Sequence, residues 1–282
     1  MPLPVVLSYI QAEELLRAHR EGQASARVSP DLGLSKVEVR LTGEGVRFPS
    51  GESLSWAGIA RIGEARNVCF ALEGDAAREI RTFSDTTGWV RALMPTNGAP
   101  TMLVAGLPMH RIKDTDPYAD TLKKVKTLAP IAGRVLDTAT GLGYTAIEAA
   151  KTAQEVVSIE LDPAGIEIAR QNPWSQPLFE RANIRIEIGD AAELIPRMES
   201  ETFSCILHDP PMITLAGDLY SAAFYREVHR ILRRGGRMFH YIGDPQSPSG
   251  KRTTAGVIRR LQDVGFTRVV RRPEAFGVVA YK

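Results

Sequence analysis

Residues 134–151, "RVLDTATGLGYTAIEAAK", are the most informative segment about the fold class of this sequence. Its apolar start ends at Asp137, two glycines follow, and the next apolar residues recur at helical spacing. A buried strand that leads through a glycine-rich turn into a helix is the first unit of an α/β sheet. Gly141 and Gly143 permit a tight turn and the close approach of a ligand.

The same alternation of apolar strands and amphipathic helices continues to the C-terminus. Further strands are predicted at 155–162, 184–190, 203–209, 236–243, 267–272 and 276–282, and helices at 121–130, 144–153, 163–172, 191–198, 221–234 and 253–266. The pattern predicts a parallel sheet covered on both faces. The final two strands are joined by a short turn at Pro273, so they must be antiparallel to each other.

Residues 1–104 have a different texture. They predict a small α+β domain with a helix over 8–22 and short strands within 36–42, 45–49, 54–62, 68–73 and 101–107. We expect this domain to select the substrate, and residues 105–282 to form the second domain.

Composition narrows the class of protein. Apolar residues make up 44% and charged residues 24% of the 282 residues, as in ordinary globular proteins. We expect no membrane span, no signal peptide and a cytoplasmic location. The two cysteines, Cys69 and Cys205, cannot form a metal cluster alone, and Cys205 lies in an apolar strand typical of a buried free thiol.

Positive charge is concentrated in the C-terminal part of the chain. Residues 226–282 hold 13 Lys and Arg against 4 Asp and Glu, a difference of +9 in a chain whose net charge is +2. Such a region can contact phosphates, which makes RNA a candidate partner. The alternative is a solvated surface with extended arginine side chains.

Acidic residues follow three consecutive predicted strands. Asp137 precedes the glycines, Glu160 follows 23 residues later, and Asp190 ends the next strand. Ligands of open α/β sheets bind at these carboxyl ends. An acid before the glycines disfavours a pyrophosphate and favours an ammonium group, and Glu160 can accept both hydroxyls of a ribose. An ordinary turn, a helix start and an N-cap are the alternatives for the three positions.

In this order and spacing, residues 120–282 resemble the class I S-adenosylmethionine-dependent methyltransferases. The resemblance implies a Rossmann-like, seven-stranded sheet with an antiparallel last strand and S-adenosylmethionine as cofactor. By that resemblance the cofactor is bound by Asp137, Thr140, Gly141, Gly143, Glu160, Leu161, Asp190, Ala191 and Asp209. The chain departs from the family at Ala139, where glycine is usual.

The fourth strand ends in "HDPP", residues 208–211, followed by Met212. This resembles the Asp/Asn-Pro-Pro-aromatic motif of methyltransferases that modify amino groups of bases. The resemblance implies that Asp209 and the carbonyl of Pro210, fixed by Pro211, accept hydrogen bonds from the target amine. Met212 replaces the aromatic residue, which puts a flipped base in doubt. A plain strand stop is the alternative.

Residues 216–236, "AGDLYSAAFYREVHRILRRGG", resemble spermidine synthases. That resemblance implies an alternative function, aminopropyl transfer from decarboxylated S-adenosylmethionine, with Asp209, Asp218 and Tyr220 at the amine. A further alternative is a non-catalytic nucleic-acid-binding protein. The segments "GLPMHRIKDTDPYADTLKK", HDPP and "FHYIGDP" also resemble the corresponding segments of an uncharacterised group of archaeal predicted methyltransferases.

Three histidines are candidates for the same pocket. His110 precedes the second domain and could act as a base, or it could be structural. His208 and His240 end two neighbouring strands. No ligand spacing supports a metal. The prediction is therefore a methyltransferase acting on an amine, with RNA favoured over a small molecule or protein as acceptor; the sequence does not predict the oligomeric state.

Overall fold

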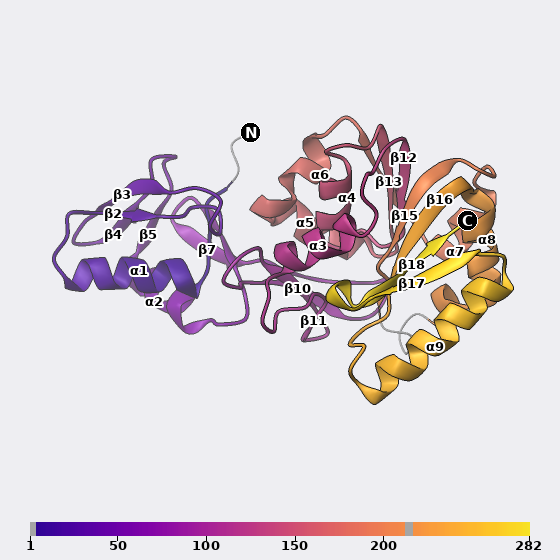
Figure 1. The fold of residues 1–282 in the computed structure, drawn as a ribbon. Coiled ribbons are helices and arrows are strands. Elements are labelled where there is room, and N and C mark those ends of the chain that lie inside the picture. Colours follow the sequence, from indigo (N-terminus) through magenta and orange to yellow (C-terminus); the bar gives the residue numbers. More distant parts are fainter. Residues whose placement is uncertain (1–3, 212–216) are drawn as a thin grey trace. The chain divides into compact units, whose positions relative to one another are not determined.

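The computed structural model describes residues 4–211 and 217–282, which form two compact units. Unit 1 is Met1–Tyr118 with Ala164–Gln176, and unit 2 is Ala119–Pro163 with Pro177–Lys282. The division predicted at residue 104, with a substrate-selecting domain over 1–104, stays a prediction. Figure 1 shows the course of the chain through both units by colour.

Unit 1 contains three antiparallel sheets, ordered β2-β3-β4-β5, β1-β6-β7 and β11-β10-β9-β8. Their strands are β1 (Val6–Leu7), β2 (Ser25–Val28), β3 (Val37–Leu41), β4 (Gly45–Arg47), β5 (Ser53–Ser55), β6 (Phe70–Glu73), β7 (Ala76–Glu79), β8 (Arg81–Phe83), β9 (Val90–Met94), β10 (Thr101–Val104) and β11 (Leu107–Pro108). Helix α1 (Tyr9–Arg20) lies within the predicted 8–22 and begins at Ser8, which forms a capping box with Gln11.

The strand predicted over 54–62 is wrong. Strand β5 ends at Ser55, and helix α2 (Trp56–Glu64) follows. The Ser55 side chain accepts a hydrogen bond from Gly58 N and caps the helix. Ile59 and Ile62 are both fully buried at a spacing of three residues, so the run has the period of a helix and not the alternation of a strand.

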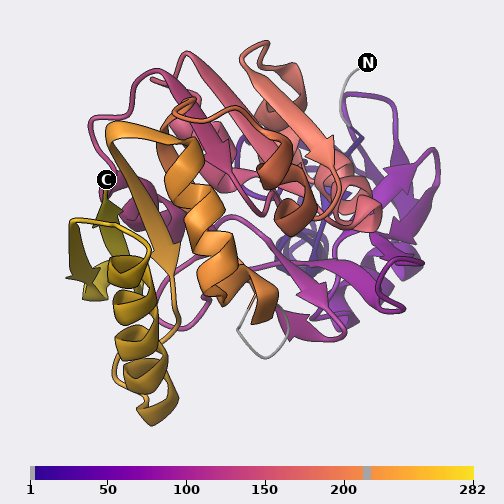
Figure 2. The ribbon, with the colours of Figure 1, turned by 90° about the vertical axis from the view of Figure 1, so that its right-hand side faces the viewer.

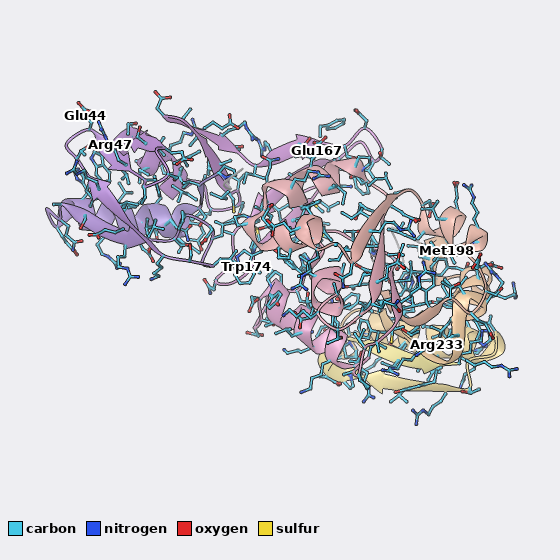
Figure 3. All side chains as sticks on the ribbon, turned by 90° about the horizontal axis from the view of Figure 1, so that it is seen from above. Glu44, Arg47, Glu167, Trp174, Met198 and Arg233 are labelled. Carbon is cyan, nitrogen blue, oxygen red and sulfur yellow. The ribbon has the colours of Figure 1, made fainter. Side chains whose placement is uncertain are left out.

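Residues 164–176 belong to unit 1 although they come late in the chain. They contain most of helix α5 (Pro163–Gln171) and the short helix η1 (Pro173–Ser175). Thr82 Oγ1 donates to Glu167 Oε2 over 2.9 Å, and Trp174 Nε1 donates to Leu32 O over 3.1 Å. Figure 3 labels Glu167 and Trp174 on this segment. The N-terminal strands therefore use a helix from the α/β part of the sequence to complete their packing.

Unit 2 is built on one seven-stranded sheet, ordered β14-β13-β12-β15-β16-β18-β17. Its strands are β12 (Arg134–Asp137), β13 (Glu155–Glu160), β14 (Ile184–Ile188), β15 (Phe203–His208), β16 (Leu232–Tyr241), β17 (Arg268–Arg272) and β18 (Gly277–Tyr281). The first five pair in parallel, and β18 pairs antiparallel with both of its neighbours. This confirms the predicted Rossmann-like sheet with an antiparallel last strand.

Helices α8 (Ala222–Ile231) and α9 (Pro248–Asp263) lie side by side on one face of this sheet (Figure 2). Their Val228 and Val257 share a core with Met238 and Val278 of the sheet. Helix α3 (Pro117–Lys126) lies on the other face, because Lys124 contacts Tyr241, which alternates with the core-facing His240. Strand β16 begins at Leu232, so the helix predicted over 221–234 ends earlier.

Two general expectations can be checked directly. Cys69 and Cys205 are both buried free thiols, and burial raises the pKa of each. This confirms the prediction for Cys205. Across residues 4–211 and 217–282, no helix combines the length and apolar character that a bilayer span requires.

Candidate active site

The first acid of the predicted site is buried at the end of β12. Asp137 Oδ2 accepts hydrogen bonds of 3.0 Å from both Thr145 Oγ1 and Ser158 Oγ. Oδ1 is buried, and no donor in the described part of the chain reaches it in hydrogen-bond geometry. Burial raises the pKa of Asp137 to about 7, against the opposing effect of the Ser158 and Thr145 hydrogen bonds. A cationic ligand bound to Oδ1 would offset the free-energy cost of burying the ionised Asp137 carboxylate.

The turn after Asp137 is held by tight packing. Gly141 and Gly143 have φ values of 54° and 77°, in the left-handed region, and Gly143 is the N-cap of α4 (Tyr144–Ala149). A Cβ on Gly143 would lie 2.5 Å from Leu178. Thr140 is buried and its hydroxyl bonds that of Ser158 over 2.7 Å. The backbone here is fixed in a form that glycine allows.

Glu160 joins this turn to the neighbouring strand. Its carboxylate accepts 2.7 Å from Gly141 N and 3.0 Å from Asp162 N. Leu161 and Ile188, at the ends of the adjacent strands β13 and β14, are 50% and 51% exposed. Large apolar side chains left open at strand ends suit the flat face of a ligand ring.

Asp190 caps the short helix α7 (Ala191–Leu194), as the N-cap alternative expected. Its Oδ1 accepts 2.8 Å from Ala192 N, the carboxylate is exposed, and Ala191 behind it is buried. A cap uses one oxygen. The structure therefore shows Asp190 as an N-cap. A contact between its carboxylate and an amino group of the ligand stays a prediction.

Asp209, at the end of β15, forms an ion pair that the sequence analysis missed. Lys124 Nζ lies 2.6 Å from Asp209 Oδ2 and 3.1 Å from Asp120 Oδ2. The Lys124 and Asp120 side chains are 5% and 1% exposed, whereas Asp209 is 19% exposed. Lys124 also lies 4.5 Å from the centroid of the Tyr241 ring. The helix was predicted over 121–130 and so excluded Asp120, whose i,i+4 spacing from Lys124 would have been the signal for the ion pair.

This arrangement fixes a positive charge beneath the site. Burial alone would lower the pKa of Lys124, but Asp209 and Asp120 together raise it above its ordinary value. Lys124 is therefore an ammonium at neutral pH and cannot serve as a base. It holds Oδ2 of Asp209, and among residues 4–211 and 217–282 nothing donates to Oδ1. Oδ1 of Asp209 can therefore accept a further hydrogen bond.

His208 and His240 form a buried pair across β15 and β16, with ring centroids 4.4 Å apart. His208 Nδ1 bonds Thr138 Oγ1 over 2.7 Å and Nε2 bonds Leu219 O over 3.0 Å. Burial lowers the pKa of His208 to about 4 and that of His240 well below its ordinary value. Both rings are neutral core groups that support the strand ends, which does not favour either as a base.

Tyr220 braces the double proline. It is buried, and its hydroxyl donates to Pro211 O over 3.1 Å. Pro210 is buried as well, so the turn after Asp209 is held from two sides. A direct role of Tyr220, Pro210 or Pro211 toward substrate stays a prediction. Met212 lies outside the described residues.

His110 belongs to unit 1, where its Nδ1 bonds Thr101 Oγ1 over 2.9 Å. Its predicted contact with cofactor or acceptor stays a prediction. No set of three His, Cys, Asp or Glu side chains in the described ranges is grouped to hold a metal ion.

Comparison with known proteins identifies the class. Residues 135–236 match the family model described as a methyltransferase domain. The chain is 42% identical over 239 residues to the uncharacterised protein MJ1233 of Methanocaldococcus jannaschii, which covers 84% of this chain and 81% of that protein. The chain belongs to the S-adenosylmethionine-dependent methyltransferase family.

Two solved structures share the fold at low identity. A spermidine synthase in complex with the transition-state analogue AdoDATO has a TM-score of 0.59 and 22% identity over 71% of each chain. The spermidine synthase of Thermotoga maritima has a TM-score of 0.57 and 19% identity over 74% of this chain and 75% of that one.

The residues at the strand ends fit S-adenosylmethionine, the cofactor of this family. Asp137, with its unpartnered buried oxygen, suits the ammonium group, and Glu160 suits the ribose. Leu161 and Ile188 offer apolar surface to adenine. These individual assignments remain predictions, but the acid nearest the phosphate-binding position of dinucleotide folds argues against a pyrophosphate ligand.

Proposed function

We propose that the enzyme methylates an amine nitrogen, and that RNA carries this amine. The observation that carries the proposal is the Asp209–Lys124 ion pair at the end of β15. It leaves one oxygen of a partly exposed carboxylate to accept a hydrogen bond. An amine N–H is a matching donor.

The bound cofactor would supply an electrophilic methyl carbon on a sulfonium. Asp209 Oδ1 would accept an N–H of the neutral amine and direct the nitrogen lone pair toward that carbon. The cofactor would donate this methyl group to the nitrogen and keep the electron pair of the broken C–S bond on its sulfur, and the nitrogen would then lose a proton to water. Orientation of this kind supplies several kcal/mol, about 7–11 for well-aligned groups.

Neither Lys124 nor His208 is suited to remove a proton from the amine, which agrees with such a mechanism. Lys124 is held as an ammonium, and His208 has a pKa of about 4 with both nitrogens bonded. A neutral amine needs no deprotonation before attack. RNA is supported as acceptor by the charge difference of +9 over residues 226–282.

The test is methyl transfer from isotopically labelled S-adenosylmethionine to bulk RNA, followed by digestion and identification of the labelled nucleoside. The expected product is a nucleoside methylated on nitrogen. Label on carbon or on a ribose oxygen would overturn the amine assignment. Label in protein and none in RNA would overturn the acceptor assignment.

Aminopropyl transfer is the second candidate, because the fold shared with spermidine synthases extends over 71% of each chain. Asp209 and Asp218, with Tyr220, would bind the amine of a cationic polyamine, as the resemblance to spermidine synthases implies. A parallel reaction with decarboxylated S-adenosylmethionine and polyamines tests it. Formation of a longer polyamine would favour this candidate over methyl transfer.

A further inference from the structure

The last strands of the sheet carry basic side chains on the face where α3 lies. Arg237 pairs with Tyr281, Tyr281 with Arg268, and Gly277 with Arg272, so these residues share one face. The opposite face, with Met238 and Val278, belongs to the core under α8 and α9. Figure 1 shows α3 and the hairpin of β17 and β18 in this unit. Strand β17 is the sheet edge.

A cavity of about 540 Å³ lies between α3 and this hairpin. Its walls include the exposed Lys123 and Lys126 of α3 together with Arg237 and Arg272 of the sheet, and we call these four residues the basic groove. Tyr281 forms part of its floor, and the Arg268 guanidinium lies 4.1 Å from the centroid of the Tyr281 ring. Glu274 is the one acid in the lining.

The four cations of the basic groove have no internal counter-ion. Within residues 4–211 and 217–282, none of them lies within ion-pair distance of a carboxylate. Arg237 donates to the Leu128 and Pro130 carbonyls, which fixes its guanidinium without neutralising it. Arg272 Nε is buried and lacks a hydrogen-bond partner in the described chain. Converging cations repel each other, and a buried donor without a partner costs free energy. An anionic ligand would offset the repulsion among the four cations.

We propose that the basic groove binds backbone phosphates of the acceptor RNA, an inference that rests on the proposed function. Arg237 and Arg272 lie at opposite ends of the β18 pairing, four residues or about 13 Å apart along the strand direction. A chain of phosphates suits this length. Helix α3 connects the two sites, because Lys123 and Lys126 line the groove while Lys124 binds Asp209.

The test variant is Lys123→Glu/Lys126→Glu, and the matched control is Arg252→Glu/Arg259→Glu. Both change the net charge by the same amount at exposed helix positions, but the control pair lies on α9 across the sheet. RNA affinity is measured by fluorescence anisotropy with a labelled single-stranded RNA over a range of salt. Cofactor affinity is measured by calorimetry as a check of folding.

The groove variant is expected to bind RNA at least tenfold more weakly at low salt, with unchanged cofactor affinity. The slope of log K against log salt should fall by about 1.4, since each lost phosphate contact on a single strand contributes about 0.7. The control should keep the slope of the parent. Equal losses in both variants would show a diffuse charge effect and overturn the proposal, as would an unchanged groove variant.

Arg272→Gln provides a variant that removes charge without reversing it, and it should lower the RNA affinity in the same direction. The outcomes separate this inference from the proposed function. RNA bound in the groove without methyl transfer would refute the function and leave the groove standing. Methyl transfer to RNA that is insensitive to the groove variant would do the reverse. If the parent protein binds inorganic phosphate in the groove but does not bind RNA, the groove proposal is overturned.

Discussion

Lys124 Nζ lies 2.6 Å from Asp209 Oδ2, so a buried ammonium on α3 contacts the carboxylate that follows strand β15. Asp120, one turn earlier on that helix, holds the same ammonium at 3.1 Å. The two acids keep Lys124 charged, and Lys124 in turn orients the carboxylate that we propose to bind the acceptor amine.

Lys124→Met should destabilise the protein by about 3–5 kcal/mol, because it removes the ammonium that pairs with the buried Asp120 carboxylate. The control is Lys151→Met, which removes the ion pair between Glu148 and the 45% exposed side chain of Lys151. That exposed pair is worth about 0–1 kcal/mol. Urea unfolding measures both. Similar losses in the two variants would show that the triad carries no special stability.

Asp209→Ala should lower kcat by about 100-fold, the scale of removing one aligned hydrogen-bonding group from a reaction centre. Cofactor affinity should fall less than kcat, although the family resemblance also places Asp209 beside the cofactor. Asp209→Asn keeps an acceptor oxygen and should lose less. The measurement is single-turnover methyl transfer alongside calorimetric titration of the cofactor. A loss confined to cofactor affinity would place Asp209 in cofactor binding and not in acceptor alignment.

Cofactor binding should depend on the ionisation of Asp137. Its pKa is raised to about 7, so the free enzyme holds this group largely protonated below pH 7. An ammonium ligand requires the carboxylate, and binding below pH 7 should therefore release a proton. We expect affinity to fall toward about tenfold per pH unit as the pH drops below 7. Calorimetry in buffers of different ionisation enthalpy counts the proton. In Asp137→Asn the pH dependence should vanish.

His208 should make the protein acid-sensitive. Burial lowers its folded-state pKa from 6.5 to about 4, so the unfolded chain binds the proton more readily between these values. The stabilising contribution is present above pH 6.5 and is lost as the pH falls toward 4, up to about 3 kcal/mol. The measurement is the free energy of unfolding against pH for the parent and His208→Gln. Parallel curves would contradict a buried neutral His208.

Gly143→Ala should be far more harmful than Gly235→Ala. Both glycines have positive φ, 77° and 71°, and both substitutions incur about 1–2 kcal/mol of backbone strain. A Cβ at Gly143 also meets Leu178 at 2.5 Å, whereas nothing lies within 4 Å at Gly235. The excess loss in unfolding free energy, and weaker cofactor binding in Gly143→Ala alone, would confirm that the turn is packed. Equal effects would show that Leu178 moves aside.

The centre of the unit 2 sheet could be predicted because β12, β13 and β15 are largely apolar runs that end at an acid or just before one, as at Asp137 and Asp209. The prediction at 54–62 was wrong because "LSWAGIARI" is short, and its helical spacing of Ile59 and Ile62 becomes clear only once Ser55 is recognised as the N-cap. The link between Lys124 and Asp209 spans 85 residues, and no local pattern gives such a pairing. The position of residues 164–176 in unit 1 is likewise a tertiary result.

Calorimetric titration with S-adenosylmethionine and with its decarboxylated form distinguishes methyl transfer from aminopropyl transfer. A methyltransferase should bind the intact cofactor more tightly, and Asp137→Ala should weaken that binding. Clear preference for the decarboxylated form would contradict methyl transfer and identify the enzyme as an aminopropyltransferase.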